Sequence, residues 1–387
     1  MKILITDADT RAALAATRSL AALGEVVVAG PAARSLAGWS RFASDRVVIP
    51  DSLERTECFL NGVLRCVQEH HIDVVVPVTD AACEVLIPVR DALAPAMLAA
   101  PSESAYRGAS DKSHVARLAK LHGLCIPEGC EVENFSQALV AATELGWPVV
   151  LKPTFSVKRT PEGRGIKLAV VRAGDTRALE EAWCTQGVER ALVQHAVPGV
   201  GEGLFILRWG GALRAAFAHR RLREKPPEGG VSVLSESIPL EEGRLRAVEA
   251  LLAELDFEGV AMAEFKVGEE GAWLMEVNAR LWGSLQLAVD AGVDFPRLFV
   301  ECLCGRPPAA PTPYRNGLRL RWFLGDLDHA LALARGARAA DGSSGLGAAL
   351  RVLLRPTGST TRFELLRRDD PWPCVLALAR WLSGRSV

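Results

Sequence analysis

Three polar residues that could hold a charged ligand stand at every second position of one short segment. Glu276, Asn278 and Arg280 alternate with apolar residues in MEVNAR (275–280). Successive side chains of an extended chain point to opposite faces, so a strand would place all three on one face. Such a row could bind a charged ligand, and a guanidinium can stabilise charge that develops in a reaction. The structural alternative is a solvated strand face with an ion pair between Glu276 and Arg280.

A second carboxylate, Glu264, precedes this row across the turn GEEG (268–271). With a two-residue loop Glu264 would face Met275, and the carboxylates would lie on opposite faces; with a three-residue loop Glu264 would lie across from Glu276. Like charges directly opposite are unfavourable without a cation between them. The second arrangement predicts a metal site of Glu264, Glu276 and Asn278 for Mg²⁺, with Mn²⁺ as an alternative, because both metals prefer oxygen ligands.

The first hundred residues alternate between strand and helix patterns. Apolar strands are expected at 2–6, 25–30, 46–50 and 73–80, with helices at 11–23 and 56–71. This order predicts a doubly wound α/β domain over residues 1–101. The first strand-to-helix turn, TDADTR, lacks the glycines of a dinucleotide site. GVGEG (199–203) precedes a strand rather than a helix whose N-terminus could bind phosphate, and the sequence has no GxxxxGK[ST] loop. Neither pattern therefore predicts a phosphate-binding loop of these two kinds.

Residues 102–312 read as an α+β domain. Strands at 147–153 and 166–171 flank the charged loop FSVKRTPEGRG (155–165), which predicts a hairpin with a mobile flap. Further strands and helices follow as far as the Pro-rich stretch 305–313. The pattern predicts antiparallel strands with helices beside them.

Residues 313–387 are expected to form a basic, mostly helical C-terminal extension. From 315 onward they contain twelve Arg, no Lys and six acids. The final segment VLALARWLSG has amphipathic helical spacing. We expect it to pack on its own domain, and binding to an anionic membrane is the alternative.

Composition excludes several classes of protein. The 387 residues are 49% hydrophobic with a net charge of -1, which indicates globular domains and gives no nucleic-acid footprint. Nine cysteines without a CxxC pair suggest reduced thiols in a cytoplasmic protein. Neither a signal peptide nor a transmembrane segment of about 18 apolar residues is expected. The partner should therefore be small.

Several motifs in order resemble the ATP-grasp superfamily, especially the carboxylate-amine ligases related to carbamoyl phosphate synthase and biotin carboxylase. The motifs are SDKSHVARLA, WPVVLKP, the glycine-bearing loop to Gly165, LVQHAVPGVGEG, AEF and MEVNAR. The resemblance covers roughly residues 1–305 and implies an α/β N-terminal domain followed by an α+β ATP-grasp fold. It also implies ATP and Mg²⁺ as cofactors.

The resemblance implies a role for each motif. Lys112 and Lys152 would contact phosphates, with Gly163 and Gly165 letting the flap close over them. Gln194 and the peptide groups near Val197 resemble the adenine-reading segment, and Glu202 resembles the acid that binds ribose. Arg280 would be catalytic, stabilising charge on the transferring and carbonyl oxygens.

Two departures from the family pattern affect these expectations. His195 stands where many relatives have Glu, so it either contributes to adenine binding or is simply a packed histidine. The flap has fewer glycines than most and carries extra charges, of which Lys158 and Arg159 are expected to face water. The stretch 218–237 resembles the substrate side, with His219, Arg223 and Ser232 as candidates for binding substrate.

Together these features predict an ATP- and Mg²⁺-dependent ligase, which activates a carboxylate as an acyl phosphate and joins it to an amine. Its partners would be small carboxylate and amine substrates, with a homodimer as a compatible assembly. One alternative is a bicarbonate-activating carboxylase or carbamate-forming enzyme. Another is a catalytically silent ATP-binding module, which the complete row of Glu276, Asn278 and Arg280 disfavours.

Overall fold

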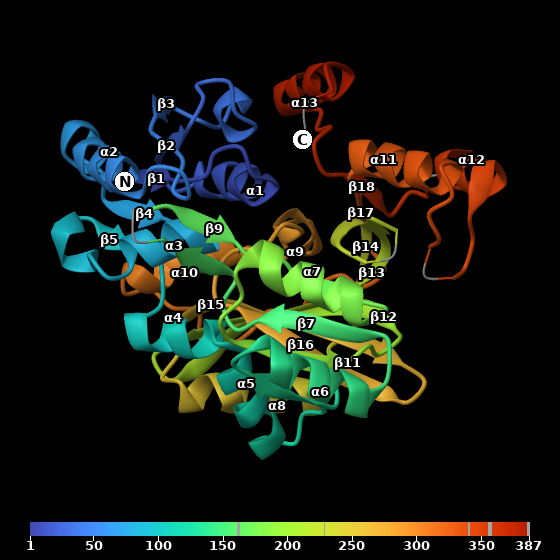
Figure 1. Ribbon diagram of the computed structural model, residues 1–387. Coiled ribbons are helices and arrows are strands. Elements are labelled where there is room, and N and C mark those ends of the chain that lie inside the picture. Colours follow the sequence, from blue (N-terminus) through green and yellow to red (C-terminus); the bar gives the residue numbers. More distant parts are fainter. Residues whose placement is uncertain (161–162, 228, 340, 355–357, 385–387) are drawn as a thin grey trace.

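The computed structural model describes residues 1–160, 163–227, 229–339, 341–354 and 358–384. Four sheets organise this part of the chain: a five-stranded N-terminal sheet, a four-stranded sheet, a two-stranded ribbon and a seven-stranded sheet. Figure 1 shows the N-terminal domain above the central sheets and the C-terminal helices to one side. None of the described helices combines the length and apolar character that crossing a membrane requires.

The N-terminal domain is a parallel sheet in the order β3-β2-β1-β4-β5. Its strands are β1 (Lys2–Ile5), β2 (Glu25–Gly30), β3 (Asp45–Val48), β4 (Val74–Val76) and β5 (Met97–Leu98). Its helices are α1 (Arg11–Leu20), η1 (Ala37–Trp39), α2 (Thr56–His70), α3 (Asp80–Leu86) and η2 (Arg90–Leu93). Apolar strands buried on both faces explain why the parallel arrangement forms. α3 begins at Asp80, directly beyond the carboxyl end of β4.

Two helices connect this domain to a four-stranded antiparallel sheet in the order β10-β7-β11-β6. The connecting helices are α4 (Glu103–Ser110) and α5 (Lys112–Leu121). The sheet and its covering helices are β6 (Gly129–Val132), α6 (Phe135–Leu145), β7 (Val149–Pro153), β10 (Val171–Ala173), α7 (Thr176–Gln186) and β11 (Ala191–His195). The predicted strand 166–171 is divided between β9 (Gly165–Lys167), which pairs with β8 (Val157–Arg159), and β10, which pairs with β7.

The seven-stranded sheet has the order β16-β15-β12-β13-β14-β17-β18. Its first five strands are antiparallel: β12 (Val200–Trp209), β13 (Ala212–Lys225), β14 (Val231–Ile238), β15 (Gly259–Gly268) and β16 (Gly271–Asn278). The accompanying helices are α8 (Glu242–Glu254), α9 (Leu285–Ala291) and α10 (Phe295–Leu303). Alternating apolar residues bury one face against α8 and α5 and the other against the N-terminal domain, α9 and α10.

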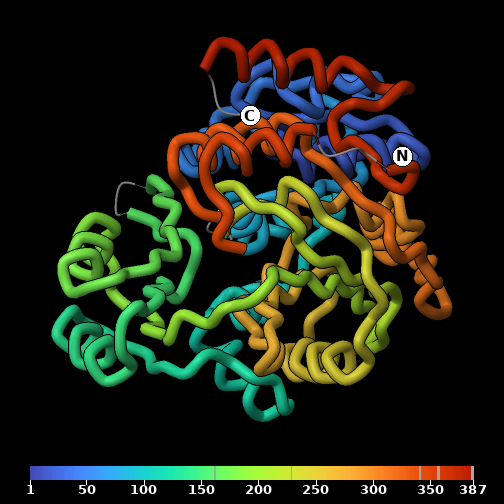
Figure 2. The backbone as a smooth tube through the Cα atoms, turned by 90° about the vertical axis from the view of Figure 1, so that its right-hand side faces the viewer, coloured from blue at the N-terminus to red at the C-terminus, as the bar shows by residue number. Residues whose placement is uncertain are grey.

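The C-terminal segment is part of this sheet, which corrects the expectation of an appended extension. β17 (Arg319–Arg321) pairs with β14, and β18 (Thr361–Phe363) pairs with β17. The helices of the segment are α11 (Phe323–Ala334), α12 (Gly345–Leu354) and α13 (Trp372–Leu382). Figure 2 shows α13 lying along the N-terminal domain. Ion pairs from Asp370 to Arg18 and from Arg380 to Asp9 hold the segment there.

Candidate active site

One row of residues crosses the seven-stranded sheet and defines the candidate site. Cross-strand pairing places Glu276 beside Glu264, Glu264 beside Gly203, and Gly203 beside His219. Residues that pair directly across strands share a face of the sheet. The structure therefore brings the two predicted carboxylates together on adjacent strands.

A β-bulge, rather than the length of the loop, produces this register. The turn between β15 and β16 has two residues, because Gly268 pairs with Gly271. That loop alone would place Glu264 opposite Met275, yet the register shifts after Phe265, which pairs with Leu274. In a β-bulge two residues of one strand lie opposite one residue of the other. The extra residue on β16 therefore shifts the pairing by one position, so that Glu264 and Glu276 point to the same face. Neither loop alternative considered from the sequence included this bulge.

The donor set of this face suits a hard cation. Asn278 Nδ2 donates to Glu276 Oε1 at 3.1 Å, so the amide and carboxylate are adjacent. Glu264 is held by two hydrogen bonds from Arg221, at 2.9 and 2.6 Å. The described residues contain no group of three His, Cys, Asp or Glu side chains placed to hold a metal. Two carboxylates and an amide oxygen are ligand types that Mg²⁺ prefers when phosphates supply the remaining oxygens, and a bound ion would displace Arg221 from Glu264 and Arg280 from Asn278.

Two buried lysines face Glu276. Lys112, the first residue of α5, lies with its Nζ 3.7 Å from Glu276 Oε2 and 3.0 Å from Ser156 Oγ. Lys152, on β7, donates to the Met275 carbonyl oxygen at 3.4 Å. The two lysines are 7% and 6% exposed. Although burial opposes ionisation, Lys112 and Asn278 hold the pKa of the Glu276 carboxyl below its usual value. The cluster thus places two lysine ammonium groups beside a buried carboxylate.

Nucleotide affinity should depend on the charge of Lys152. Burial lowers the pKa of this lysine to about 8, and Glu276 and Glu264 only partly oppose the effect. The ammonium therefore loses its proton as the pH rises through about 8, and affinity for an ATP analogue should fall up to ~10-fold between pH 7 and pH 9. Calorimetric titration across this range measures the effect.

The matched variant is Lys152→Arg, because a guanidinium keeps its charge over the whole range. Its binding should vary much less with pH than that of the wild type. Equal pH dependence in the two proteins would exclude Lys152 as the titrating phosphate ligand.

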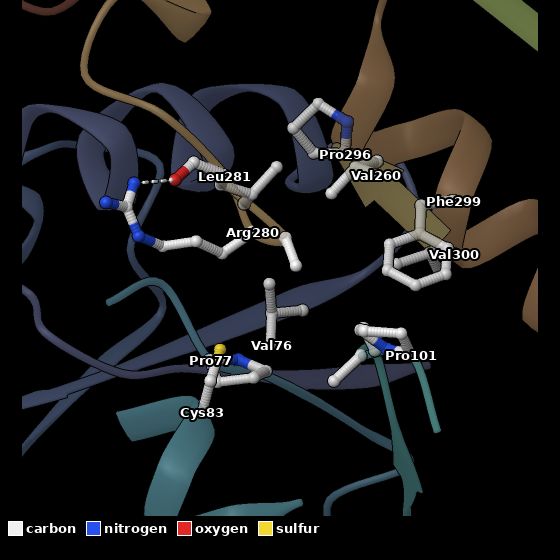
Figure 3. A pocket seen from close by; sticks show the side chains of 13 residues that line it. Val76, Pro77, Cys83, Pro101, Val260, Arg280, Leu281, Pro296, Phe299 and Val300 are labelled. Atoms are coloured by element: carbon white, nitrogen blue, oxygen red, sulfur yellow. Dashed lines mark hydrogen bonds between the residues drawn. The ribbon is translucent and has the colours of Figure 1, made fainter. Parts of the chain in front are cut away.

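Arg280 connects the row to the N-terminal domain. Its Nη2 lies 2.8 Å from Asp80 Oδ2 and donates to Asn278 Oδ1 at 3.1 Å. The predicted alternative of an ion pair with Glu276 is therefore wrong. Figure 3 shows the stem of Arg280 lining a small apolar pocket while its guanidinium turns away toward the Leu281 carbonyl. This pocket, which Cys83 also lines, lies where the N-terminal domain packs against the seven-stranded sheet and α10.

The residues expected near adenine and ribose lie in different environments, and they do not all face the same side of the sheet. Gln194 is buried on β11, and its Oε1 has no hydrogen-bond partner among the described residues. Val197 follows in the connection to β12, and His195 is exposed, so the packed-histidine alternative is wrong. Glu202 pairs across strands with Phe265 and binds Arg244 at 2.7 Å on the α8 side. Because Glu202 lies on the face opposite Glu264, the geometry gives no support to its ribose role.

The flap docks on the N-terminal domain. Gly163, with φ +77°, lies in the loop, and the N–H of Gly165 donates to the Leu53 carbonyl at 2.6 Å. Arg159 donates to the Ala81 carbonyl at 3.0 Å and lies 3.6 Å from Glu84. The expectation that Arg159 faces water is therefore wrong, because α2 and α3 offer acceptors. Lys158 lies at the surface as expected, where it forms a solvent-exposed ion pair with Glu189 at 2.6 Å. Residues 161 and 162 of the predicted flap lie outside the described residues.

The β8–β9 ribbon should respond to nucleotide. Closing over phosphates orders such a loop, so amides of residues 155–160 and 163–167 should exchange more slowly when an ATP analogue is bound. Hydrogen exchange followed by mass spectrometry measures this change. Arg159→Ala removes the docking contacts and should speed exchange in the free protein. Exchange that is unaffected by the analogue would argue against a phosphate-binding flap.

The three candidate substrate residues do not converge. His219 is buried, with its ring 4.8 Å from that of Phe205, and burial lowers its pKa to about 3. Arg223 makes a two-pronged ion pair with buried Asp326 at 2.7 and 2.9 Å. Ser232 lies near the start of β14 opposite Glu224, whereas His219 pairs with Ser237 near its end. Arg223 is thus engaged in an internal ion pair, whereas both ring nitrogens of His219 are buried without a hydrogen-bond partner among the described residues. The described contacts do not bring the three residues to one point.

Two residues of the site were missed from the sequence. Arg221 lies two positions after His219 on β13, so strand periodicity could have placed it on the face of Glu264. Asp80 follows the strand β4 of a parallel sheet, and ligand-binding residues gather at the carboxyl ends of such strands. Neither pattern predicts which residue is contacted, because the contacts of Arg221 with Glu264 and of Asp80 with Arg280 join distant parts of the chain.

These features define the class of protein. A small antiparallel sheet and a larger one, preceded by a doubly wound domain, are the elements of the ATP-grasp fold, and the predicted resemblance is confirmed. Residues 188–325 match the family described as ATP-grasp in the biosynthetic pathway with Ter operon. Comparison with curated protein sequences finds no significant match.

Solved structures with this fold are distant in sequence. The biotin carboxylase domain of 2-oxoglutarate carboxylase from Hydrogenobacter thermophilus, solved with MgADP, ADP and bicarbonate, is 15% identical, with TM-score 0.64, 82% of this chain and 73% of that chain covered. An ADP complex of N5-carboxyaminoimidazole ribonucleotide synthetase is 16% identical, with TM-score 0.62 and coverages of 91% and 94%. An L-amino acid ligase from Bacillus licheniformis is 18% identical, with TM-score 0.58 and coverages of 78% and 73%.

Proposed function

We propose that this protein is an ATP-dependent ligase that activates a carboxylate as an acyl phosphate and joins it to an amine. The observation that carries the proposal is the convergence of Lys112, Lys152, Glu276, Asn278 and Arg280. Phosphoryl transfer needs positioning and charge stabilisation more than covalent chemistry from the protein, and this cluster supplies both. The likeness to an L-amino acid ligase supports the same reading.

Each residue has a defined part in this proposal. Lys152 and Lys112 bind the phosphates of ATP, and Glu264, Glu276 and Asn278 would hold Mg²⁺, which supplies charge neutralisation for those phosphates. Arg280, anchored by Asp80 at 2.8 Å, stabilises charge on the carboxylate being activated. Gln194 and the peptide groups near Val197 bind adenine, and the ribbon containing Gly163 and Gly165 covers the phosphates.

Activation of bicarbonate is the second candidate. One structural neighbour was solved with MgADP and bicarbonate, and its structure contains a dimer of that domain. A homodimer is accordingly proposed for this chain as well, and sedimentation measures its mass in solution.

Trapping the activated acid tests the proposal. Carboxylic acids are incubated singly with the protein, ATP, Mg²⁺ and hydroxylamine, and the hydroxamate identifies the acid without knowledge of the amine. Formation of ADP and hydroxamate with an organic acid is expected. Release of ADP only with bicarbonate would favour the second candidate, and no release under any condition would contradict both.

A further inference from the structure

A second polar cluster surrounds Arg11, the first residue of α1. Its Nη1 donates to Glu364 Oε2 at 2.7 Å and to the Ser232 carbonyl at 3.4 Å. The guanidinium carbon lies 4.2 Å from the centroid of the Trp322 ring, so the ring covers one face of the cation. The Arg11 side chain remains 13% exposed. The N-terminal domain, β14 and the C-terminal segment thus build one charged site around the Arg11–Glu364 ion pair.

Three polar atoms of the residues that contact Arg11 are buried and unpaired. They are Ser232 Oγ, Glu364 Oε1 and Trp322 Nε1, none of which has a hydrogen-bond partner among the described residues. Leaving such an atom unsatisfied costs about 1–3 kcal/mol, and folded proteins leave few of them. Glu364 is 2% exposed and is therefore a nine-tenths buried carboxylate with one free oxygen. Unpaired donors and acceptors around one guanidinium indicate a ligand that carries complementary groups.

The position of this cluster relates it to the proposed reaction. A side-chain carbon built on Gly283 would lie 3.4 Å from Arg11 Nη2. Gly283 belongs to the segment that follows β16 and contains Arg280. Ser232 lies just after the connection between β13 and β14. The Arg11 cluster therefore adjoins the segment that carries the proposed catalytic arginine.

We propose that Arg11, Glu364 and Ser232 bind the amine substrate and that this substrate is a zwitterion of the α-amino acid class. This inference rests on the proposed function. The free Nη2 of Arg11 accounts for a carboxylate, because a guanidinium pairs with it through parallel N–H groups. The free oxygen of Glu364 accounts for an ammonium group a short distance away.

Binding of individual amino acids to the full chain tests this inference. Each standard L-amino acid is titrated in saturation-transfer NMR, and each is compared with its α-amide, which keeps the amine but lacks the carboxylate. At least one amino acid should bind, and its amide should bind at least tenfold more weakly. Arg11→Met should weaken the amino acid at least tenfold and leave the affinity for an ATP analogue unchanged. Arg362→Met, on exposed β18, is the matched control and should bind like the wild type.

Further variants protect the test against a loss of folding. Ser232→Ala removes only a hydroxyl and should weaken the amino acid severalfold with an unchanged unfolding midpoint. If no amino acid binds while hydroxamates form from an organic acid, the amine site is elsewhere and this inference is overturned. Equal binding of acid and amide, or of wild type and Arg11→Met, overturns it as well. Selective amino-acid binding without any ATP turnover would support the site and contradict the proposed function instead.

Discussion

Replacing Arg280 by Ala should lower kcat by ~10²- to 10³-fold and leave affinity for an ATP analogue within a few fold. In the proposed reaction the guanidinium, which donates to Asn278, stabilises charge that develops on the acyl group in the transition state rather than in the ground state. Lys152→Ala should instead weaken ATP binding, because it removes a ground-state phosphate contact. Calorimetry with an ATP analogue and turnover of both variants separate the two roles.

The pairing of Arg280 with Asp80 complicates this variant and provides its control. Removing one partner of a partly buried ion pair costs up to about 3 kcal/mol, so the unfolding free energy of Arg280→Ala must be measured beside its kinetics. The double variant with Asp80→Asn removes the unpaired carboxylate and should recover stability without recovering kcat. Arg246→Ala, on the exposed face of α8, should change neither quantity. If saturating ATP restores the rate of Arg280→Ala, this arginine is an ordinary nucleotide ligand.

Replacing Glu276 by Gln should lower turnover by ~10²-fold or more and preserve the fold. The amide keeps the shape of the side chain but removes a negative charge from the proposed metal site. Glu276 also faces Lys112 at 3.7 Å, so its loss leaves two buried lysines without that counter-charge. Steady-state turnover over a range of Mg²⁺ concentrations measures the effect.

The matched control is Glu270→Gln in the exposed turn between β15 and β16. It removes the same charge from the same hairpin but away from the row, and it should behave like the wild type. Activity of Glu276→Gln that equals the wild type at ordinary Mg²⁺ concentrations would rule out the metal role. A defect that is overcome by excess Mg²⁺ would instead support it, because weaker binding is then the cause.

The sequence by itself determined the elements and the composition of the row. Periodicity of two placed Glu276 and Asn278 together, since residues on one strand share a face whatever the strand packs against, and Arg280 follows just beyond the end of that strand. The alternation of apolar strands and helices likewise indicated the doubly wound N-terminal domain. These are local properties, which is why they can be read without knowledge of the fold.

The tertiary structure decided which partners these residues meet. The bulge at Met275 set the parity of the hairpin, and no residue type in the sequence marks it. The partner of Arg280 is Asp80, two hundred residues earlier, and the C-terminal segment enters the sheet through β17 rather than standing apart. Glu202 illustrates the same limit, because the face it occupies depends on its register with Phe265. Contacts between distant segments depend on packing and register, which local spacing does not encode.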